Sequence, residues 1–282
     1  MARISVLLDG GIGNLLFQYA ASLTLQEKYG YDVSLRAMDP GLTQRLESYV
    51  GKIETVAHKQ PFGNNRLFSS QYQNLKWQAG IEKINRRLTT KWSGDFHPCE
   101  APYPGFVRVL KGYFQHPSWF AESLNAVLEK LASERQGIQH TVPVGLTSVH
   151  LRRSDYVRLG WDLPFAYYEK SFNDNPKLLE CPIAVFSDDK LAKTLLEKEL
   201  ARMGADIYVS PFESRDSAKF DFFTISQSKN IVMSNSTFCW WATKLASVDN
   251  PDLNVICPEK WLPDENSNEL IDPLWRKLEH YL

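Results

Sequence analysis

Residues 4–20 read ISVLLDGGIGNLLFQYA, and this stretch decides the fold. The apolar run Ile4–Leu8 ends at Asp9-Gly10-Gly11, which predicts a buried strand that enters a tight turn. Apolar residues from Leu15 to Tyr29 recur at helical spacing, and Gly30 follows as a C-cap. Because Tyr31–Leu35 then predicts a second strand, the first 35 residues predict one β-α-β unit.

The rest of the chain continues the alternation of strands and helices, most clearly after residue 145. This α/β pattern predicts parallel sheets with helices on both faces, which bind ligands at the carboxyl ends of their strands. A border near Thr141-Val142-Pro143 predicts two lobes, residues 1–143 and 144–282, with a C-terminal helix that packs back on the first lobe. Residues 39–103 predict helices and loops without defined borders. Further strands are expected at Val107–Phe114, Leu146–Leu151, Ile183–Phe186, Ile207–Val209, Ile231–Met233 and Val255–Cys257, and helices at Pro117–Leu131, Phe165–Phe172, Leu191–Met203, Phe220–Gln227 and Phe238–Ala246.

Bulk composition narrows the classes of function. The 282 residues are 43% hydrophobic and 23% charged, which suffices to bury a full core. A formal net charge of −1 argues against a nucleic-acid-binding protein, so any anionic ligand must be held by a local cluster. The apolar run near the start is too short for a signal peptide, and no stretch reaches the roughly 20 apolar residues of a membrane span. We therefore expect a cytoplasmic protein without a transmembrane segment, for which peripheral membrane association stays open.

The four cysteines are scattered and form no C-x-x-C pair, so neither a zinc site nor a disulfide framework is expected. Two of them, Cys239 and Cys257, lie inside apolar runs and are predicted to be buried thiols. The sequence does not indicate an oligomeric state.

Three clusters could hold a ligand, and the first is the glycine turn Gly10–Asn14. Glycines between a strand and a helix let a ligand approach the backbone, and a helix N-terminus attracts anions. A purely structural tight turn is the alternative. The nicotinamide-type pattern G-x-G-x-x-G fails, because Leu16 replaces its third glycine and Arg36 stands where an acidic ribose ligand is expected.

The second cluster, His150–Tyr156, places two adjacent arginines directly after a predicted strand. Because side chains alternate along a strand, His150 and Arg152 share one face and Leu151 points to the other. A guanidinium fits phosphate oxygens as a planar fork, and Asp155 could orient it. The alternative is a surface ion pair between arginine and aspartate.

The third cluster, Ser234–Trp241, follows a strand and opens a helix. Its hydroxyls and backbone N–H groups could grip a diphosphate, or Ser236 or Thr237 could simply cap the helix. Ser187-Asp188-Asp189 also follows a strand and leaves open a D-x-D-like metal site, a base-binding carboxylate or a helix N-cap. Because the two arginines can neutralise a diphosphate, a metal is not required.

Together these clusters resemble the motifs of the bacterial α-1,2-fucosyltransferases, glycosyltransferase family 11. The motifs are Gly-Gly-x-Gly-Asn-x-x-Phe-Gln-Tyr-Ala from residue 10, His-x-Arg-Arg-x-Asp-Tyr from residue 150 and Ser-Asn-Ser-Thr-Phe-x-Trp-Trp-Ala from residue 234. Phe186–Asp189 and Pro258–Trp261 also fit, so the resemblance spans residues 4 to 261. The chain departs from the family at Leu15-Leu16, where a polar-Met pair is common, and at Ser154, where glycine is common.

The resemblance implies two Rossmann-like lobes of GT-B type with a donor cleft between them. It implies an inverting enzyme that moves L-fucose from GDP-β-L-fucose to the 2-hydroxyl of a terminal galactoside in a glycan acceptor, without a cofactor or a metal. Arg152 is expected to bind the β-phosphate and act in catalysis, and Asp162 is a candidate base, unless it is a plain surface-loop aspartate. His150 and either Asp188 or Asp189 are expected to contact guanine. The full donor-binding set is Gly11, Gly13, Asn14, His150, Arg152, Arg153, Asp155, Asp188, Asp189, Ser236, Thr237 and Phe238.

Other functions fit parts of the same pattern. A fucosyltransferase of another linkage, such as α-1,6, would share the arginine motif. A non-catalytic nucleotide-sugar or polysaccharide-binding protein would need the same phosphate contacts but no acceptor groove. A P-loop kinase is disfavoured because G-x-x-x-x-G-K-[ST] is absent. We expect residues 39–103 to select the acceptor and the second half of the chain to bind the donor.

Overall fold

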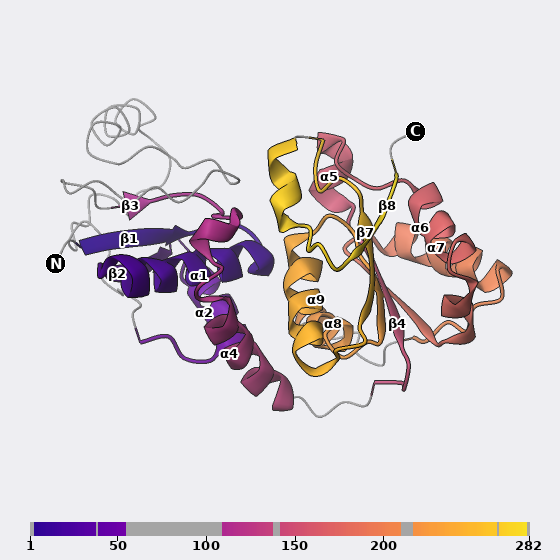
Figure 1. Ribbon diagram of the computed structural model, residues 1–282, viewed down its shortest axis with the longest axis horizontal. Coiled ribbons are helices and arrows are strands. Elements are labelled where there is room, and N and C mark those ends of the chain that lie inside the picture. Colours follow the sequence, from indigo (N-terminus) through magenta and orange to yellow (C-terminus); the bar gives the residue numbers. More distant parts are fainter. Residues whose placement is uncertain are drawn as a thin grey trace. The chain divides into compact units, whose positions relative to one another are not determined.

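A computed structural model describes residues 3–37, 39–54, 109–137, 142–209, 217–263 and 265–280. The chain divides into two compact units, Met1–Val127 and Leu128–Leu282, and each unit contains one parallel sheet (Figure 1). The division falls inside the helix α4 (Leu124–Gln136). The α/β architecture predicted from the alternating pattern is therefore present in both units.

The first unit is built around the predicted β-α-β segment. Strand β1 (Arg3–Leu8) leads into helix α1 (Ile12–Tyr29), and β2 (Asp32–Ala37) returns parallel to β1. Gly30 ends α1 in the left-handed conformation at φ 64°, as its position predicted. The sheet order is β2-β1-β3, where β3 is Val109–Leu110, and helix α2 (Pro40–Val50) follows β2. Residues 55–103 of the proposed acceptor region lie outside the described residues.

Two predictions for the end of this unit are wrong. The helix expected at Pro117–Leu131 is a short 3-10 helix, η2 (Pro117–Trp119), followed by a turn and then α4. The chain leaves the helical region at Phe120, and the Ser123 hydroxyl donates to Ala20 O at 2.7 Å, which fixes the turn against α1. The strand expected to run to Phe114 ends at Leu110, and Phe114 itself adopts a φ of 53°, outside the extended region.

The second unit holds a five-stranded parallel sheet in the order β5-β4-β6-β7-β8. In Figure 1, α8 and α9 lie on one face of this sheet and α6 and α7 on the other. Leu151 packs in the core beneath α6 and α7, whereas the ring of His150 contacts Phe238 of α9, so these neighbours face opposite sides as predicted. The elements are β4 (Thr147–Leu151), α5 (Ser154–Leu159), α6 (Phe165–Asn173), η3 (Pro176–Glu180), β5 (Ile183–Ser187), α7 (Lys190–Arg202), α8 (Ser217–Ile225), β6 (Asn230–Val232), α9 (Thr237–Asp249), β7 (Asn254–Pro258), η4 (Glu265–Leu270) and β8 (Arg276–Leu278).

Two further predictions are corrected here. The strand expected at Ile207–Val209 is a single β-bridge between Ile207 and Ile183. This segment pairs at only one position with β5, the edge strand of the sheet. The expected C-terminal helix is a strand, β8, whose Leu278 is buried and pairs with Pro258. Backbone pairing with β7 therefore decides the conformation of this segment.

The strand order changes direction between β4 and β6. Strand β5 lies on one side of β4, and the chain then crosses back so that β6 lies on the other side. Pairing between β4 and β6 ends at Val149 and Val232, and the strands separate beyond these residues. In open parallel sheets, ligands bind outside the carboxyl ends of the strands at such a reversal point. The second and third sequence clusters both begin here.

Candidate functional site

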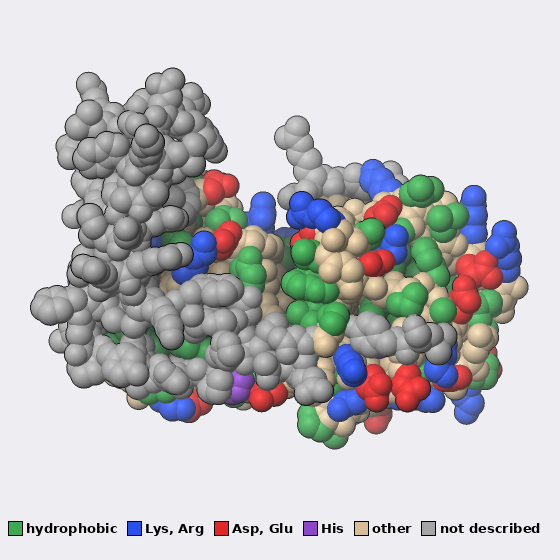
Figure 2. Space-filling model, turned by 90° about the horizontal axis from the view of Figure 1, so that it is seen from above, with side chains coloured by type: hydrophobic (Ala, Val, Ile, Leu, Met, Phe, Trp, Pro, Cys, Tyr) green, Lys and Arg blue, Asp and Glu red, His purple; other side chains and the backbone are tan. Residues whose placement is uncertain are grey.

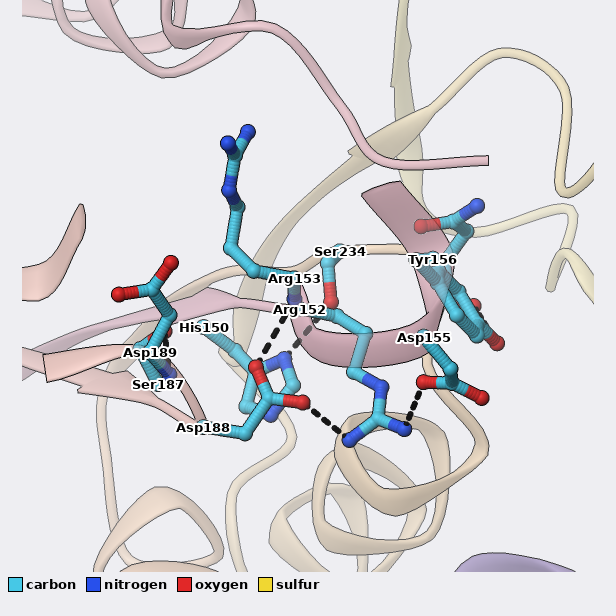
Figure 3. A network of polar contacts seen from close by, with 10 residues as sticks. His150, Arg152, Arg153, Asp155, Tyr156, Ser187, Asp188, Asp189 and Ser234 are labelled. Carbon is cyan, nitrogen blue, oxygen red and sulfur yellow. Dashed lines mark hydrogen bonds and ion pairs between the residues drawn. The ribbon is translucent and has the colours of Figure 1, made fainter. Parts of the chain in front are cut away.

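His150 lies at the carboxyl end of β4, where its side chain reaches across to the loop after β6 (Figure 3). Its Nδ1 atom lies 2.7 Å from Ser234 Oγ, and its ring stacks on Phe238 at a centroid distance of 5.6 Å. Burial lowers the pKa of His150 to about 4; Asp188 opposes this shift and Arg152 adds to it. The imidazole is therefore neutral near pH 7, and one of its nitrogens is an acceptor.

Because this pKa lies below the value of about 6.5 for an unfolded histidine, His150 makes stability depend on pH. Between pH 6.5 and 4 the unfolded chain binds a proton that the native imidazole does not. The contribution of His150 to the free energy of unfolding is therefore highest above pH 6.5. It decreases by about 3 kcal/mol in total as the pH falls toward 4. Urea unfolding of the parent and His150→Asn should show the parent losing this amount relative to the variant across that range. A pH-independent difference between the two proteins would contradict the burial of a neutral His150.

Arg152 lies immediately beyond β4, and its guanidinium fork binds two carboxylates (Figure 3). Nη1 donates to Asp188 Oδ2, and Nη2 donates to Asp155 Oδ1. The guanidinium also lies 5.2 Å from the ring centroid of Tyr156, at cation–π distance. The ion pair with Asp155, offered above as an alternative to phosphate binding, is therefore present. The same contacts hold the fork in one orientation at the carboxyl edge of the sheet.

Arg153 has a different environment, and its side chain points away from that of Arg152 (Figure 3). Its backbone N–H donates to Asp188 Oδ1 at 2.9 Å, and its Nη1 donates to Asp162 Oδ2 at 2.6 Å. Its Nε atom is buried and has no hydrogen-bond partner among the described residues. The two adjacent arginines thus both contact Asp188, but their guanidinium groups lie in different places and would not bind the same ligand atom.

The structure separates the roles of the two adjacent aspartates. Asp188 accepts one hydrogen bond on each oxygen, from Arg152 and from the Arg153 backbone. Asp189 is the N-cap of α7, where its Oδ1 accepts from the N–H groups of Leu191 and Ala192 at 3.0 Å. The N-cap interpretation therefore holds for Asp189. Asp188 instead binds the segment Arg152–Asp162, which we call the arginine loop.

The turn Ser234–Phe238 connects β6 to α9 on the other side of the strand reversal. Ser236 occupies the N-cap position of α9, but its side chain makes no capping hydrogen bond, and it is 5% exposed. Simple capping by the Ser236 hydroxyl is therefore wrong. Thr237 and Phe238 form the first turn of the helix, so backbone N–H groups of this turn face the end where an anion would be attracted.

Asn235 ties this turn to the arginine loop, and sequence reasoning assigned it no role. It is fully buried, its Nδ2 donates to Trp161 O at 2.8 Å, and its backbone O accepts from the Tyr156 hydroxyl at 3.2 Å. Asn235 and Tyr156 stand in the quoted motifs, so their positions were visible. Their contacts were not, because they join segments almost 80 residues apart.

The glycine turn lies in the first unit, at the carboxyl end of β1. Gly10 has a φ of 86°, Gly11 is the N-cap of α1, and Gly13 is buried in its first turn. A Cβ on Gly10 would lie 2.9 Å from the Asn14 side chain, so only glycine fits this close approach. The Asn14 Oδ1 in turn accepts from Gln115 Nε2 at 3.1 Å.

Gln18 holds this turn together and was also not predicted. Its Oε1 accepts from Asp9 N–H at 3.0 Å, and its Nε2 donates to the carbonyls of Asp9 and Gly112. The side chain is completely buried. It therefore fixes the ends of β1 and of the segment after β3 at the point where the first sheet reverses its strand order.

The remaining general predictions concern charge, metals and membranes. On the face drawn in Figure 2, Lys and Arg side chains of the second unit lie interspersed with Asp and Glu side chains. Cys239 and Cys257 are buried thiols, as predicted, and burial raises the pKa of each to about 12. Among the described residues, no group of three or more His, Cys, Asp or Glu side chains could hold a metal ion. None of the described helices is both long and apolar enough to cross a bilayer.

Comparison with known proteins places the chain in a family. The model of Glycosyl transferase family 11 matches residues 73–268, which include the arginine loop and the Ser234–Phe238 turn. The chain belongs to glycosyl transferase family 11. It is 31% identical to the O-antigen biosynthesis glycosyltransferase WbnK of Escherichia coli, over 96% of this chain and 99% of that protein. The family resemblance drawn from the three motifs is confirmed.

One solved structure supports the fold class of this family member. A structure of an Arabidopsis thaliana FUT1 mutant in complex with GDP matches with a TM-score of 0.53 and 12% identity, over 95% of this chain and 72% of that one. The E. coli heptosyltransferase WaaC with ADP matches with a TM-score of 0.46 and 15% identity, over 95% and 89%. With two parallel α/β units, the family 11 chain has the predicted GT-B type fold.

Proposed function

We propose that this family 11 glycosyltransferase moves L-fucose from GDP-β-L-fucose to the 2-hydroxyl of a terminal galactoside, with inversion at the fucosyl carbon. The observation that carries the proposal is the position of the Arg152 fork. It directly follows β4, and His150 at the end of β4 contacts Ser234 of the Ser234–Phe238 turn, where the strand order of the second sheet reverses. The relatives support it, because FUT1 was solved with GDP and WbnK is named for O-antigen biosynthesis.

The reaction requires charge stabilisation at the leaving group. As the bond between the fucosyl carbon and the β-phosphate oxygen breaks, negative charge develops on GDP and the acceptor oxygen bonds to that carbon. An oriented guanidinium near the β-phosphate stabilises this transition state more than the ground state. Because Asp155 and Asp188 already occupy both Nη atoms, the phosphate would share the fork with one carboxylate or displace it.

The acceptor hydroxyl must lose a proton, and Asp162 is the proposed base. Its side chain is 22% exposed, so it is partly accessible from solvent. Its Oδ2 binds Arg153, which leaves Oδ1 to accept a proton. In this arrangement Arg153 orients Asp162, as Asp155 and Asp188 orient Arg152.

We propose that transfer needs no divalent metal, because a guanidinium can carry the charge that Mg²⁺ carries elsewhere. Turnover in excess EDTA should equal turnover without EDTA. Turnover that is abolished by EDTA and restored by Mg²⁺ or Mn²⁺ would contradict this proposal. That result would make Asp188 and Asp189 candidate metal ligands.

A donor comparison tests the proposal directly. The protein would be incubated with a β-galactoside and, in turn, GDP-fucose, GDP-mannose or UDP-galactose, with release of the nucleotide measured. We expect acceptor-dependent release of GDP from GDP-fucose alone. Faster turnover of either other donor would refute the donor assignment. A rate of GDP release that does not depend on the acceptor would refute the proposed transfer reaction.

A further inference from the structure

Two adjacent tyrosines of α6 contact the ends of the two strands that enclose the candidate site. The Tyr168 hydroxyl donates to His150 O at 3.2 Å, at the carboxyl end of β4. The Tyr167 hydroxyl donates to Met233 O at 2.8 Å, just past the end of β6. Both carbonyls belong to the residues that follow the last β4–β6 pair, Val149 with Val232.

The surroundings fix both hydroxyls in place. Tyr167 and Tyr168 are at most 1% exposed, and their rings pack edge to face at a centroid distance of 5.0 Å. Burial raises the pKa of each phenol well above 10, so both hydroxyls stay protonated and able to donate. They therefore supply hydrogen bonds to backbone carbonyls at the level where the strands have stopped pairing with each other.

The contacts also bear on the side chains of the site. His150 carries one of the two carbonyls, and its imidazole reaches the hydroxyl of Ser234, the residue after Met233. The tyrosines approach from the α6 face, whereas the His150 ring lies against Phe238 of α9. Both ends of the His150–Ser234 contact are thus held through the backbone from the opposite face of the sheet.

We propose that Tyr167 and Tyr168 are positioning residues of the donor site, which fix the separation of the β4 and β6 ends and with it the geometry of His150 and the Ser234–Phe238 turn. The proposal rests on the proposed function for its ligand, GDP. Neither tyrosine touches that ligand in this account. A rigid backbone at the reversal point would preorganise the polar groups that bind the diphosphate and the base.

The test compares Tyr167→Phe, Tyr168→Phe and the double variant with Ser228→Ala. The control removes the buried Ser228 hydroxyl, which lies before the opposite end of β6 and contacts Ser148 Oγ at 2.6 Å and Thr224 O at 3.1 Å. GDP binding would be measured by calorimetry, the His150 imidazole by NMR titration and stability by thermal unfolding. Phenylalanine retains the rings, so only the hydroxyls are tested.

We expect all variants to lose thermal stability, but only the tyrosine variants to lose GDP affinity, by about tenfold in the double variant. Their His150 pKa should rise from about 4 toward 6.5, whereas that of Ser228→Ala should not. A GDP Kd within twofold of the parent in the double variant, with an unchanged His150 signal, would overturn the inference and leave the proposed function intact. If the parent itself failed to bind GDP, the proposed function would fall, and the His150 signal would still decide whether the hydroxyls position that residue.

Discussion

Replacement of Arg152 by alanine should lower turnover by about 10²–10³-fold while the protein stays folded. Removing one preorganised charged donor from a transition state typically costs about 3–4 kcal/mol. We expect the variant to fold because Arg152 is partly exposed, with 31% of its side chain accessible. The rate with GDP-fucose and acceptor, measured beside a thermal unfolding curve, gives both quantities.

Two controls separate the fork from mere positive charge. Arg152→Lys keeps the charge but not the planar pair of donors, so it should recover little of the lost rate. Arg158→Ala removes an exposed arginine from α5, the helix that follows Arg152, and should leave turnover near the parent value. Activity of Arg152→Ala within tenfold of the parent would contradict the role assigned to the fork.

The second large effect is expected at Asp188, which orders both arginines. Asp188→Ala removes the partner of Arg152 Nη1 and the acceptor of the Arg153 N–H together. Loss of an orienting contact of this kind should lower turnover by about 10- to 100-fold. Asp188→Asn keeps a neutral acceptor for the backbone N–H and should lose less.

Asp189 is the matched control, because it is the adjacent aspartate but caps α7. Asp189→Ala should lower the free energy of unfolding by about 1 kcal/mol and leave turnover almost unchanged. Kinetics and urea unfolding of both variants therefore test the division of roles. Equal losses of activity at the two positions would contradict it and would place Asp189 in the donor site.

The sequence predicted most of the fold for a physical reason. Strands buried on both faces read as short apolar runs, as in Ile183–Phe186, and glycines mark helix ends, as at Gly30. The predictions failed where tertiary contacts override local pattern. Periodicity predicts one helix over Pro117–Leu131, but a turn that Ser123 fixes against α1 interrupts it before α4 begins at Leu124. Strand β8 exists because β7 offers it a pairing edge.

The same distinction applies to the site. The three clusters were visible because chemistry-bearing residues directly follow strands. Within the second sheet, parallel strands bring the second and third clusters to one edge. The pairing of Asp188 with Arg152 was not visible, since 36 residues separate them. Buried contacts made by Gln18, Asn235 and the α6 tyrosines leave no local signature, because a polar residue in a helix or motif does not show what it binds.

Product linkage tests the central claim most directly. The protein would be incubated with GDP-fucose and a panel of galactosides, and each product would be analysed by NMR. We predict an α-L-fucosyl residue on the 2-hydroxyl of a terminal galactose, which requires inversion of the β-configured donor. Fucose on a different hydroxyl, such as a 6-hydroxyl, a β-linked product, or no transfer to any galactoside would contradict the claim.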